Sequence, residues 1–172
     1  MKTRMAAALI FSGVASSAFA AELHLLGDQC VSYARGNPAE APIFKMAPNY
    51  TLGALSQTRA PWLGGTLYYN GYTVPQDYVE AAKWFQKGAE IGDHRSQFSF
   101  AVMLWKGEGV RRDAVEAHKW MNLAAVSATT NYGLPTTLGL QLATKCRDNM
   151  ALQMTPAQIA EAHRLAAAWK PK

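Results

Sequence analysis

The histidines, the cysteines and one glycine-rich turn are the residues of this chain whose types could support catalysis or bind a metal. The four histidines are His24, His94, His118 and His163. They fall in separate segments, and neither a His-x-x-x-His nor a Cys-x-x-Cys spacing occurs. Gly107-Glu108-Gly109 is similar to part of a phosphate-binding loop, but the lysine of such loops is missing. We therefore predict no metal and no cofactor, and we interpret this turn as the end of a helix.

Nucleophilic side chains are no better placed for catalysis. Asp93 and His94 are adjacent, but no serine or cysteine lies in a recognisable nucleophile motif, and no Ser-x-x-Lys follows residue 20. Arg111 and Arg112 form a small basic patch, which we interpret as a solvated loop, with an anionic partner site as the alternative. We predict no catalytic residue and no enzymatic activity.

The first twenty residues have the features of an export signal. Lys2 and Arg4 precede a mostly apolar stretch, and Ala18-Phe19-Ala20 places small residues where a signal peptidase cleaves. An uncleaved anchor is the alternative, but the stretch 5–20 is shorter than the ~20 apolar residues that span a bilayer. The sequence predicts cleavage before Ala21 and no stable membrane insertion of the mature chain, which would be periplasmic in a Gram-negative host.

The composition predicts one globular domain with a real core, because 49% of the 172 residues are hydrophobic and 17% are charged. Loss of the two signal cations lowers the formal net charge from +5 to +3, which gives little support to nucleic-acid binding. In an oxidising compartment, Cys30 and Cys146 would close a loop of about 115 residues, worth roughly 4–5 kcal/mol. We favour this disulfide over two buried thiols or one reactive thiol.

An internal repeat sets the fold. Residues 71–84 and 107–120 align without a gap at an offset of 36 and are identical at eight of fourteen positions. In both copies an aspartate, Asp77 or Asp113, is placed to cap a helix, and Glu80 or Glu116 three residues later is placed to complete a capping box. A helix pair of this kind cannot bury both of its faces alone, so pairs must stack. The sequence predicts an all-α fold, a short right-handed α-solenoid of helix-turn-helix repeats.

The repeat divides the chain into four parts. We predict a signal peptide at 1–20, an irregular capping segment at 21–58, two repeats at 59–92 and 93–127, and C-terminal capping helices within 128–172. One of these capping helices is expected at 138–150. Another should begin with the capping box Thr155-Pro156-Ala157-Gln158 and run to about Lys170.

Aromatic residues at helical spacing mark the first helix of each repeat. Phe98 and Trp105 lie seven residues apart in the second copy, and Trp62 and Tyr69 take the same positions in the first. We considered this stripe as the surface that binds a partner, because aromatic anchors dominate the affinity of many interfaces. The favoured alternative is that these side chains pack between the repeats.

The sequence resembles the Sel-one-like repeat family, a branch of the tetratricopeptide-like helical repeats, from about Ala60 to Lys170. The residues that carry the resemblance are Gly71, Asp77, Ala81, Trp84, Gly107, Gly109, Asp113, Ala117 and Trp120. Two departures from the family pattern occur in the first copy, which has Gly64 in place of the usual leucine and Thr73 opposite Gly109.

The resemblance implies that the protein is an adaptor, which binds a protein or peptide through a helical-repeat surface and performs no catalysis. The alternative is a module that binds peptidoglycan or exopolysaccharide of the cell envelope.

Overall fold

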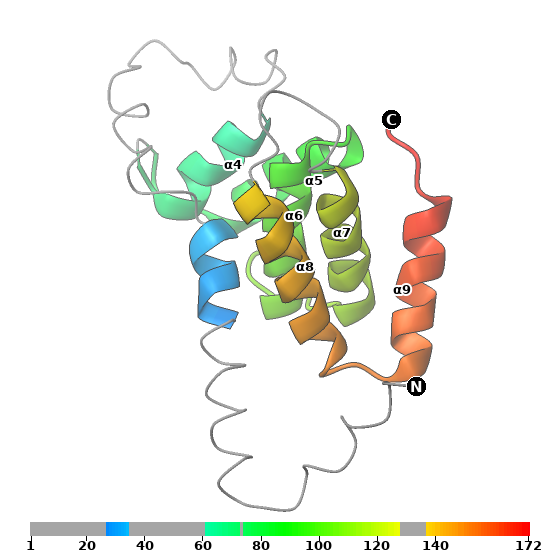
Figure 1. Ribbon diagram of the computed structural model, residues 1–172. Coiled ribbons are helices and arrows are strands. Elements are labelled where there is room, and N and C mark those ends of the chain that lie inside the picture. Colours follow the sequence, from blue (N-terminus) through cyan, green and yellow to red (C-terminus); the bar gives the residue numbers. More distant parts are fainter. Residues whose placement is uncertain (1–26, 35–60, 73, 128–136) are drawn as a thin grey trace, which may run out of the picture.

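The computed structural model describes residues 27–34, 61–72, 74–127 and 137–172, and the regular structure within these ranges is helical (Figure 1). A short helix spans 27–34. The further helices are α4 (Pro61–Asn70), α5 (Tyr78–Glu90), α6 (His94–Lys106), α7 (Ala114–Ser127), α8 (Thr137–Ala151) and α9 (Pro156–Ala168). The predicted export signal, most of the segment 21–58 and the linker 128–136 lie outside the described residues. In the described part of the chain, no helix has the length and apolar character needed to cross a membrane.

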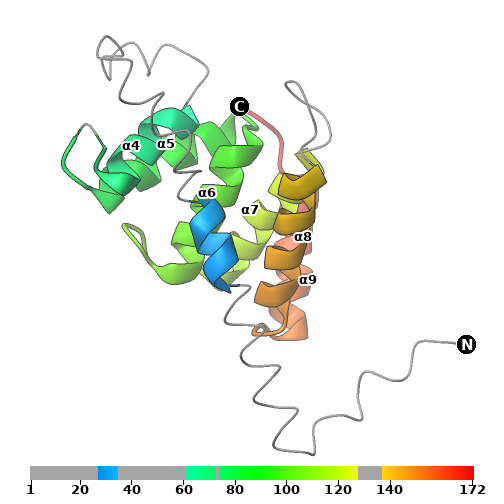
Figure 2. The same ribbon diagram turned by 60° about the vertical axis from the view of Figure 1, so that its left-hand side comes forward.

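The helices stack as consecutive pairs. α4 packs along α5 and α6 packs along α7, and each pair is formed by one copy of the repeat. α5 also packs against α6, which joins the two pairs into one stack (Figure 2). The predicted all-α fold of stacked helix-turn-helix repeats is confirmed.

Aspartates start the repeat helices as predicted. Asp77 accepts hydrogen bonds from the backbone N–H groups of Val79 and Glu80 at the start of α5, and Asp113 caps α7 in the same way. The second half of each predicted capping box is wrong. The Glu80 carboxylate accepts instead from Lys83, and Glu116 makes the equivalent bond one turn into α7. The backbone N–H groups of Asp77 and Asp113, which the box would have used, donate instead to the carbonyl oxygens of Tyr68 and Leu104.

The glycines of α4 allow unusually close packing. A Cβ built on Gly64 would lie 2.7 Å from the Trp84 ring, and one on Gly65 would lie 2.4 Å from the Phe85 ring. Both rings belong to α5, so the two glycines let the aromatic residues of α5 rest directly on the backbone of α4. Glycine at position 64 lowers the intrinsic helix propensity of α4, but it leaves the space that Trp84 of the repeat motif occupies.

Gly109 fixes the contact between the loops of the two repeats. Its φ is +67°, and a Cβ at this position would lie 2.1 Å from the carbonyl oxygen of Tyr78, the first residue of α5. Only glycine meets both the conformation and the space. Thr73, the equivalent residue of the first copy, lies outside the described residues.

The C-terminal helices complete the stack. Thr155 and Gln158 form the predicted capping box at the start of α9, with Pro156 at the first helical position. Both α8 and α9 pack against α7, which lies between them in Figure 1. After α9 the chain returns to the first repeat, where the backbone N–H of Lys172 donates to the carbonyl oxygen of Glu90 and its ammonium group pairs with the Glu90 carboxylate.

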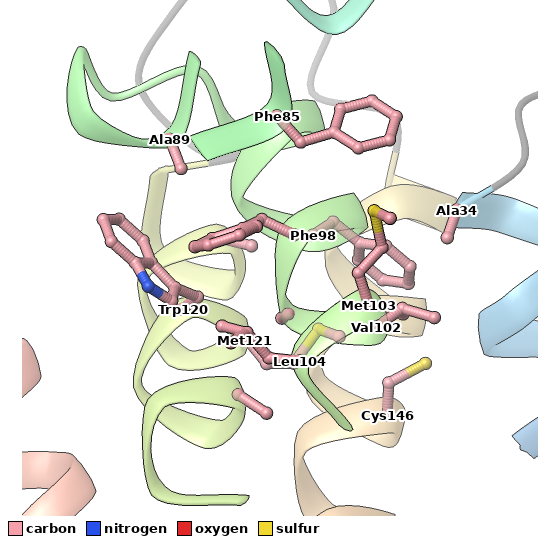
Figure 3. Close-up of a cluster of buried hydrophobic side chains, with 14 of the residues drawn as sticks. Ala34, Phe85, Ala89, Phe98, Val102, Met103, Leu104, Trp120, Met121 and Cys146 are labelled. Carbon is pink, nitrogen blue, oxygen red and sulfur yellow. The ribbon is translucent and has the colours of Figure 1, made fainter. Parts of the chain in front are cut away.

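The core lies between the stacked pairs and is filled mainly from α5, α6 and α7 (Figure 3). Its largest fully buried side chains include Phe85, Met103 and Met121, one from each of these helices. The small motif residues Ala81 and Ala117 are completely buried, which lets neighbouring helices approach closely. Large and small side chains of the repeats are thus buried together where the helices pack.

Candidate partner-binding face

Two of the four predicted aromatic anchors are core residues rather than surface residues. Tyr69 and Phe98 are each only 2% exposed, so neither offers a surface to a partner. The Tyr69 ring packs against Tyr78 and Phe85 of α5, and its hydroxyl donates a hydrogen bond of 2.6 Å to the carboxylate of Glu108. Tyr69 thus connects the two repeats from the inside. At Tyr69 and Phe98 the candidate binding stripe is wrong, and the favoured alternative, burial within the stack, applies.

Phe98 is buried because the chain covers it with another of its own helices. The ring of Tyr33, in helix 27–34, lies edge-on to the Phe98 ring with 4.7 Å between the centroids. The neighbouring Ser99 donates its hydroxyl to the carbonyl oxygen of Ala34, at 3.1 Å, and both residues are buried. Helix 27–34 therefore lies against the middle of α6, on the face where the aromatic stripe was predicted (Figures 1 and 2).

The disulfide predicted from the two cysteines ties this helix to α8. Cys30 and Cys146 are bonded, with 5.9 Å between their Cα atoms, and both are buried. Cys30, Tyr33 and Ala34 face the body of the protein at positions i, i+3 and i+4. The exposed positions of the same helix carry polar side chains, among them Gln29 and Ser32. Helix 27–34 is therefore a small amphipathic helix seated on α6 and α8.

The other two predicted anchors remain at the surface, and each is paired with an arginine. Trp62 and Trp105 are half-buried. The guanidinium of Arg95 lies 4.8 Å from the centroid of the Trp62 ring, and that of Arg112 lies 5.4 Å from Trp105. Arg112 also donates from Nε to the carbonyl oxygen of Trp105, at 3.0 Å, which fixes its position at the end of α6. Each pair therefore presents an aromatic ring and a cation at the surface.

The positions of these groups along α6 place them on both sides of helix 27–34. Arg95 precedes Phe98 by one turn, and Trp105 follows Phe98 by two turns, so the three share one side of the helix. We define the partner-binding face as the pairs Trp62–Arg95 and Trp105–Arg112 together with the part of α6 and α8 that helix 27–34 covers. Sequence reasoning missed Arg95 and helix 27–34, because periodicity within one helix does not show which distant segment packs on it.

Asp93 and Glu108, two carboxylates near this face, are engaged in contacts within the chain. Asp93 caps α6 by accepting from the backbone N–H of Ser96. Glu108 accepts from Tyr69 and pairs with Lys106. Arg95 and Arg112 are exposed, and their interactions described here are with tryptophan rings and a carbonyl oxygen. At both ends of α6, an anionic group of a partner could therefore pair with an arginine, and an aromatic group could stack on an arginine or a tryptophan.

The histidines do not form a reactive site in the described residues. His118 is 1% exposed, and its ring lies 5.3 Å from that of His163. Burial, with smaller contributions from the charges of His163 and Arg147, lowers the pKa of His118 to about 4. Burial also lowers the pKa of His94. Among the described residues, no three histidine, cysteine, aspartate or glutamate side chains are placed to hold a metal ion.

Comparison with known proteins identifies the repeats. The profile of the Sel1 repeat family matches residues 62–93 and 94–125, which correspond to the α4–α5 and α6–α7 pairs. The chain therefore contains two Sel1 repeats in tandem, and the predicted resemblance is confirmed. Sel1 repeats generally mediate protein–protein interaction and typically act as non-catalytic scaffolds. A comparison with curated protein sequences found no match.

The fold is similar to that of a solved structure. It is the crystal structure of c5321, described as a protective antigen present in uropathogenic Escherichia coli strains displaying an SLR fold. The similarity covers 87% of this chain, with a TM-score of 0.55 and 24% sequence identity. This chain corresponds to 30% of the length of that protein. The likeness supports the helical-repeat fold and nothing about the partner.

Proposed function

We propose that the chain is an exported, non-enzymatic adaptor that binds a protein partner through the partner-binding face. The observation that carries the proposal is the exposure of two tryptophan–arginine pairs at both ends of α6, on a scaffold of tandem Sel1 repeats. Tryptophan and arginine are the residue types most enriched among the energetic centres of protein interfaces. Arg95 and Trp105, one residue of each pair, lie on α6, which packs against α5 and α7.

Two features support export to an oxidising compartment such as a bacterial periplasm. The first is the signal-like sequence of residues 1–20. The second is the disulfide between Cys30 and Cys146, since such bonds persist mainly outside the reducing cytosol. A fractionation experiment with an antibody against the chain tests this part of the proposal, which requires the protein in the envelope fraction without its first twenty residues.

The binding role is tested by a crosslinked pull-down from envelope extract with a matched pair of variants. Arg95→Gln/Arg112→Gln removes both cations of the face, while Lys87→Gln/Arg164→Gln removes two cations from α5 and α9. We expect one protein to be recovered in stoichiometric amounts by the wild type and by the α5/α9 variant, and to be reduced at least about tenfold by Arg95→Gln/Arg112→Gln. Equal loss with both variants would show non-specific charge attraction.

Purified cell wall from the same envelope distinguishes the glycan-binding alternative from the adaptor role. An envelope polysaccharide binder would sediment with purified cell wall, and sugar rings would stack on Trp62 and Trp105. The guanidinium groups already lie over these rings, which favours the protein partner. Retention on cell wall without a recovered protein would refute the adaptor proposal.

A further inference from the structure

We propose that the part of α6 and α8 beneath helix 27–34 is a docking site for a short amphipathic helix, which this chain closes with its own residues 27–34 and locks with the Cys30–Cys146 bond. The proposal rests on the proposed function, because it names the kind of partner that this face takes when it is open. That partner is a helix with a small residue, an aromatic residue and a second small residue at positions i, i+3 and i+4.

The contacts of helix 27–34 define what the site recognises. The aromatic position is filled by Tyr33, which meets Phe98 edge to face. The second small position is filled by Ala34, which is 2% exposed and whose carbonyl oxygen accepts from Ser99. Figure 3 shows Ala34 on the ribbon of helix 27–34 at the edge of the buried cluster that contains Met103. This is the pattern of a helix laid by its apolar side on a hydrophobic surface.

The helix depends on this surface for its structure. An isolated helix of eight residues is not stable in water, so residues 27–34 owe their helical form to the contacts with α6 and α8. In sequence, helix 27–34 is separated from α4 by residues 35–60, which fully extended could reach about 90 Å. The covalent connection to α4 therefore does not require the helix to sit on this surface. The contacts and the disulfide hold it there.

The disulfide sets whether the site is closed or open. A dithiol reductant opens it by thiol–disulfide exchange, in which one of its thiolates attacks a sulfur of the Cys30–Cys146 bond and forms a mixed disulfide. The second thiol of the reductant then displaces the protein sulfur. The chain gains two thiols, and the reductant becomes a cyclic disulfide. Once the bond is broken, helix 27–34 is held only by its non-covalent contacts, and a partner helix competes with it.

A fluorescent peptide of residues 25–36 with Cys30→Ser tests the site on the full mature chain. The oxidised wild type should bind it weakly or not at all. The chain variant Cys30→Ser/Ala34→Arg cannot form the bond and cannot bury its own helix, so we expect its affinity for the peptide to be at least about tenfold higher. A peptide that also carries Ala34→Arg is the control and should not bind. Equal affinity of the wild type and the variant, or no binding to a variant whose remaining helices still unfold cooperatively in urea, would overturn the proposal.

A second experiment keeps the test decisive if that variant fails to fold. The milder chain variant Cys30→Ser leaves the Cys146 thiol free, and glutathione disulfide is supplied as the oxidant. A 25–36 peptide with its natural cysteine should form a mixed disulfide with Cys146, seen by mass spectrometry, with release of two equivalents of glutathione. The control peptide, Cys30→Ser/Ser32→Cys, places its thiol on the exposed side and should react at least about tenfold less. Equal reaction of both peptides would show random oxidation and refute docking.

The outcomes also separate this proposal from the adaptor role. If the peptide docks and the pull-down recovers no protein, the docking site stands and the adaptor role fails. If a protein is recovered and is lost with Arg95→Gln/Arg112→Gln, but the peptide does not dock, only the helix-docking site is refuted.

Discussion

His118 makes the stability of the stack depend on pH well above the range in which carboxylates titrate. Its ring is buried beside His163, and the charges of Arg147 and Asp148 of α8 also act on it. Burial first, then the charges of His163 and Arg147, lower the pKa of His118 to about 4, while Asp148 acts in the opposite direction. In the unfolded chain the same side chain has its ordinary pKa of about 6.5.

The sign and size of the effect follow from these two pKa values. As the pH falls below 6.5, the unfolded state binds a proton at His118 and the folded state does not until about pH 4, so the free energy of unfolding decreases. Between pH 7.5 and pH 5 the loss amounts to about 2 kcal/mol, and it would reach about 3.4 kcal/mol once the folded state is protonated as well.

Urea unfolding followed by circular dichroism at pH 7.5, 6.5, 5.5 and 5 measures this slope. In the variant His118→Gln the loss of about 2 kcal/mol should disappear. His94→Gln is the matched control, since the pKa of His94 is also lowered, without the second histidine beside it, and should remove a smaller part. The lowered pKa values of Glu90 and Glu161 act mainly below this window. A slope in His118→Gln equal to that of the wild type would refute the reasoning.

Three further predictions concern the stability of the stack. The variant Cys30→Ser/Cys146→Ser opens a loop that spans 116 residues in sequence, and its free energy of unfolding should be lower by about 4–5 kcal/mol. Alkylation of the denatured, unreduced wild type should label neither cysteine. Gly65→Ala should lower the free energy of unfolding by about 1–3 kcal/mol, because the new methyl group meets an aromatic ring of α5. Gly27→Ala, where no atom lies within 4 Å of the new methyl group, should leave this free energy unchanged or raise it by up to ~1 kcal/mol. Equal effects of the two variants in urea titrations would contradict this explanation. Asp113→Ala should cost about 1 kcal/mol through loss of the α7 cap, and Asp113→Asn should restore most of it, as thermal unfolding would show.

The parts of the fold that depend on residues close in sequence could be predicted from the sequence. The 36-residue offset predicts both helix pairs, and the types of Asp77 and Asp113 predict where their second helices begin. The Thr155–Gln158 box was predictable for the same reason, since a cap involves residues only three apart. Even at this scale a competing partner changes the result, because the backbone N–H of Asp77 donates to the carbonyl oxygen of Tyr68 and not to Glu80.

The candidate site depends on contacts between distant segments, and these were harder to predict. The spacing of Trp62, Tyr69, Phe98 and Trp105 indicated an apolar side of each first helix but not what covers it. Helix 27–34 covers the middle of that side and leaves the two tryptophans near its ends. The cysteines carried a signal for this arrangement, because a bond from Cys30 to Cys146 places the N-terminal segment against α8. What the bond could not show is that α6 lies beneath the same helix.

The C-terminal return of the chain changes how the stack should lose its structure. Repeat arrays commonly fray from their ends, because each unit contacts only its neighbours. Here Lys172 is bonded to Glu90 across 82 residues, and the Cys30–Cys146 link spans 116. The disulfide holds helix 27–34 to α8, and the bonds to Glu90 hold the segment after α9 to α5. We therefore expect helix 27–34 and α8 to lose their structure in one step, with the disulfide as the stronger of the two ties.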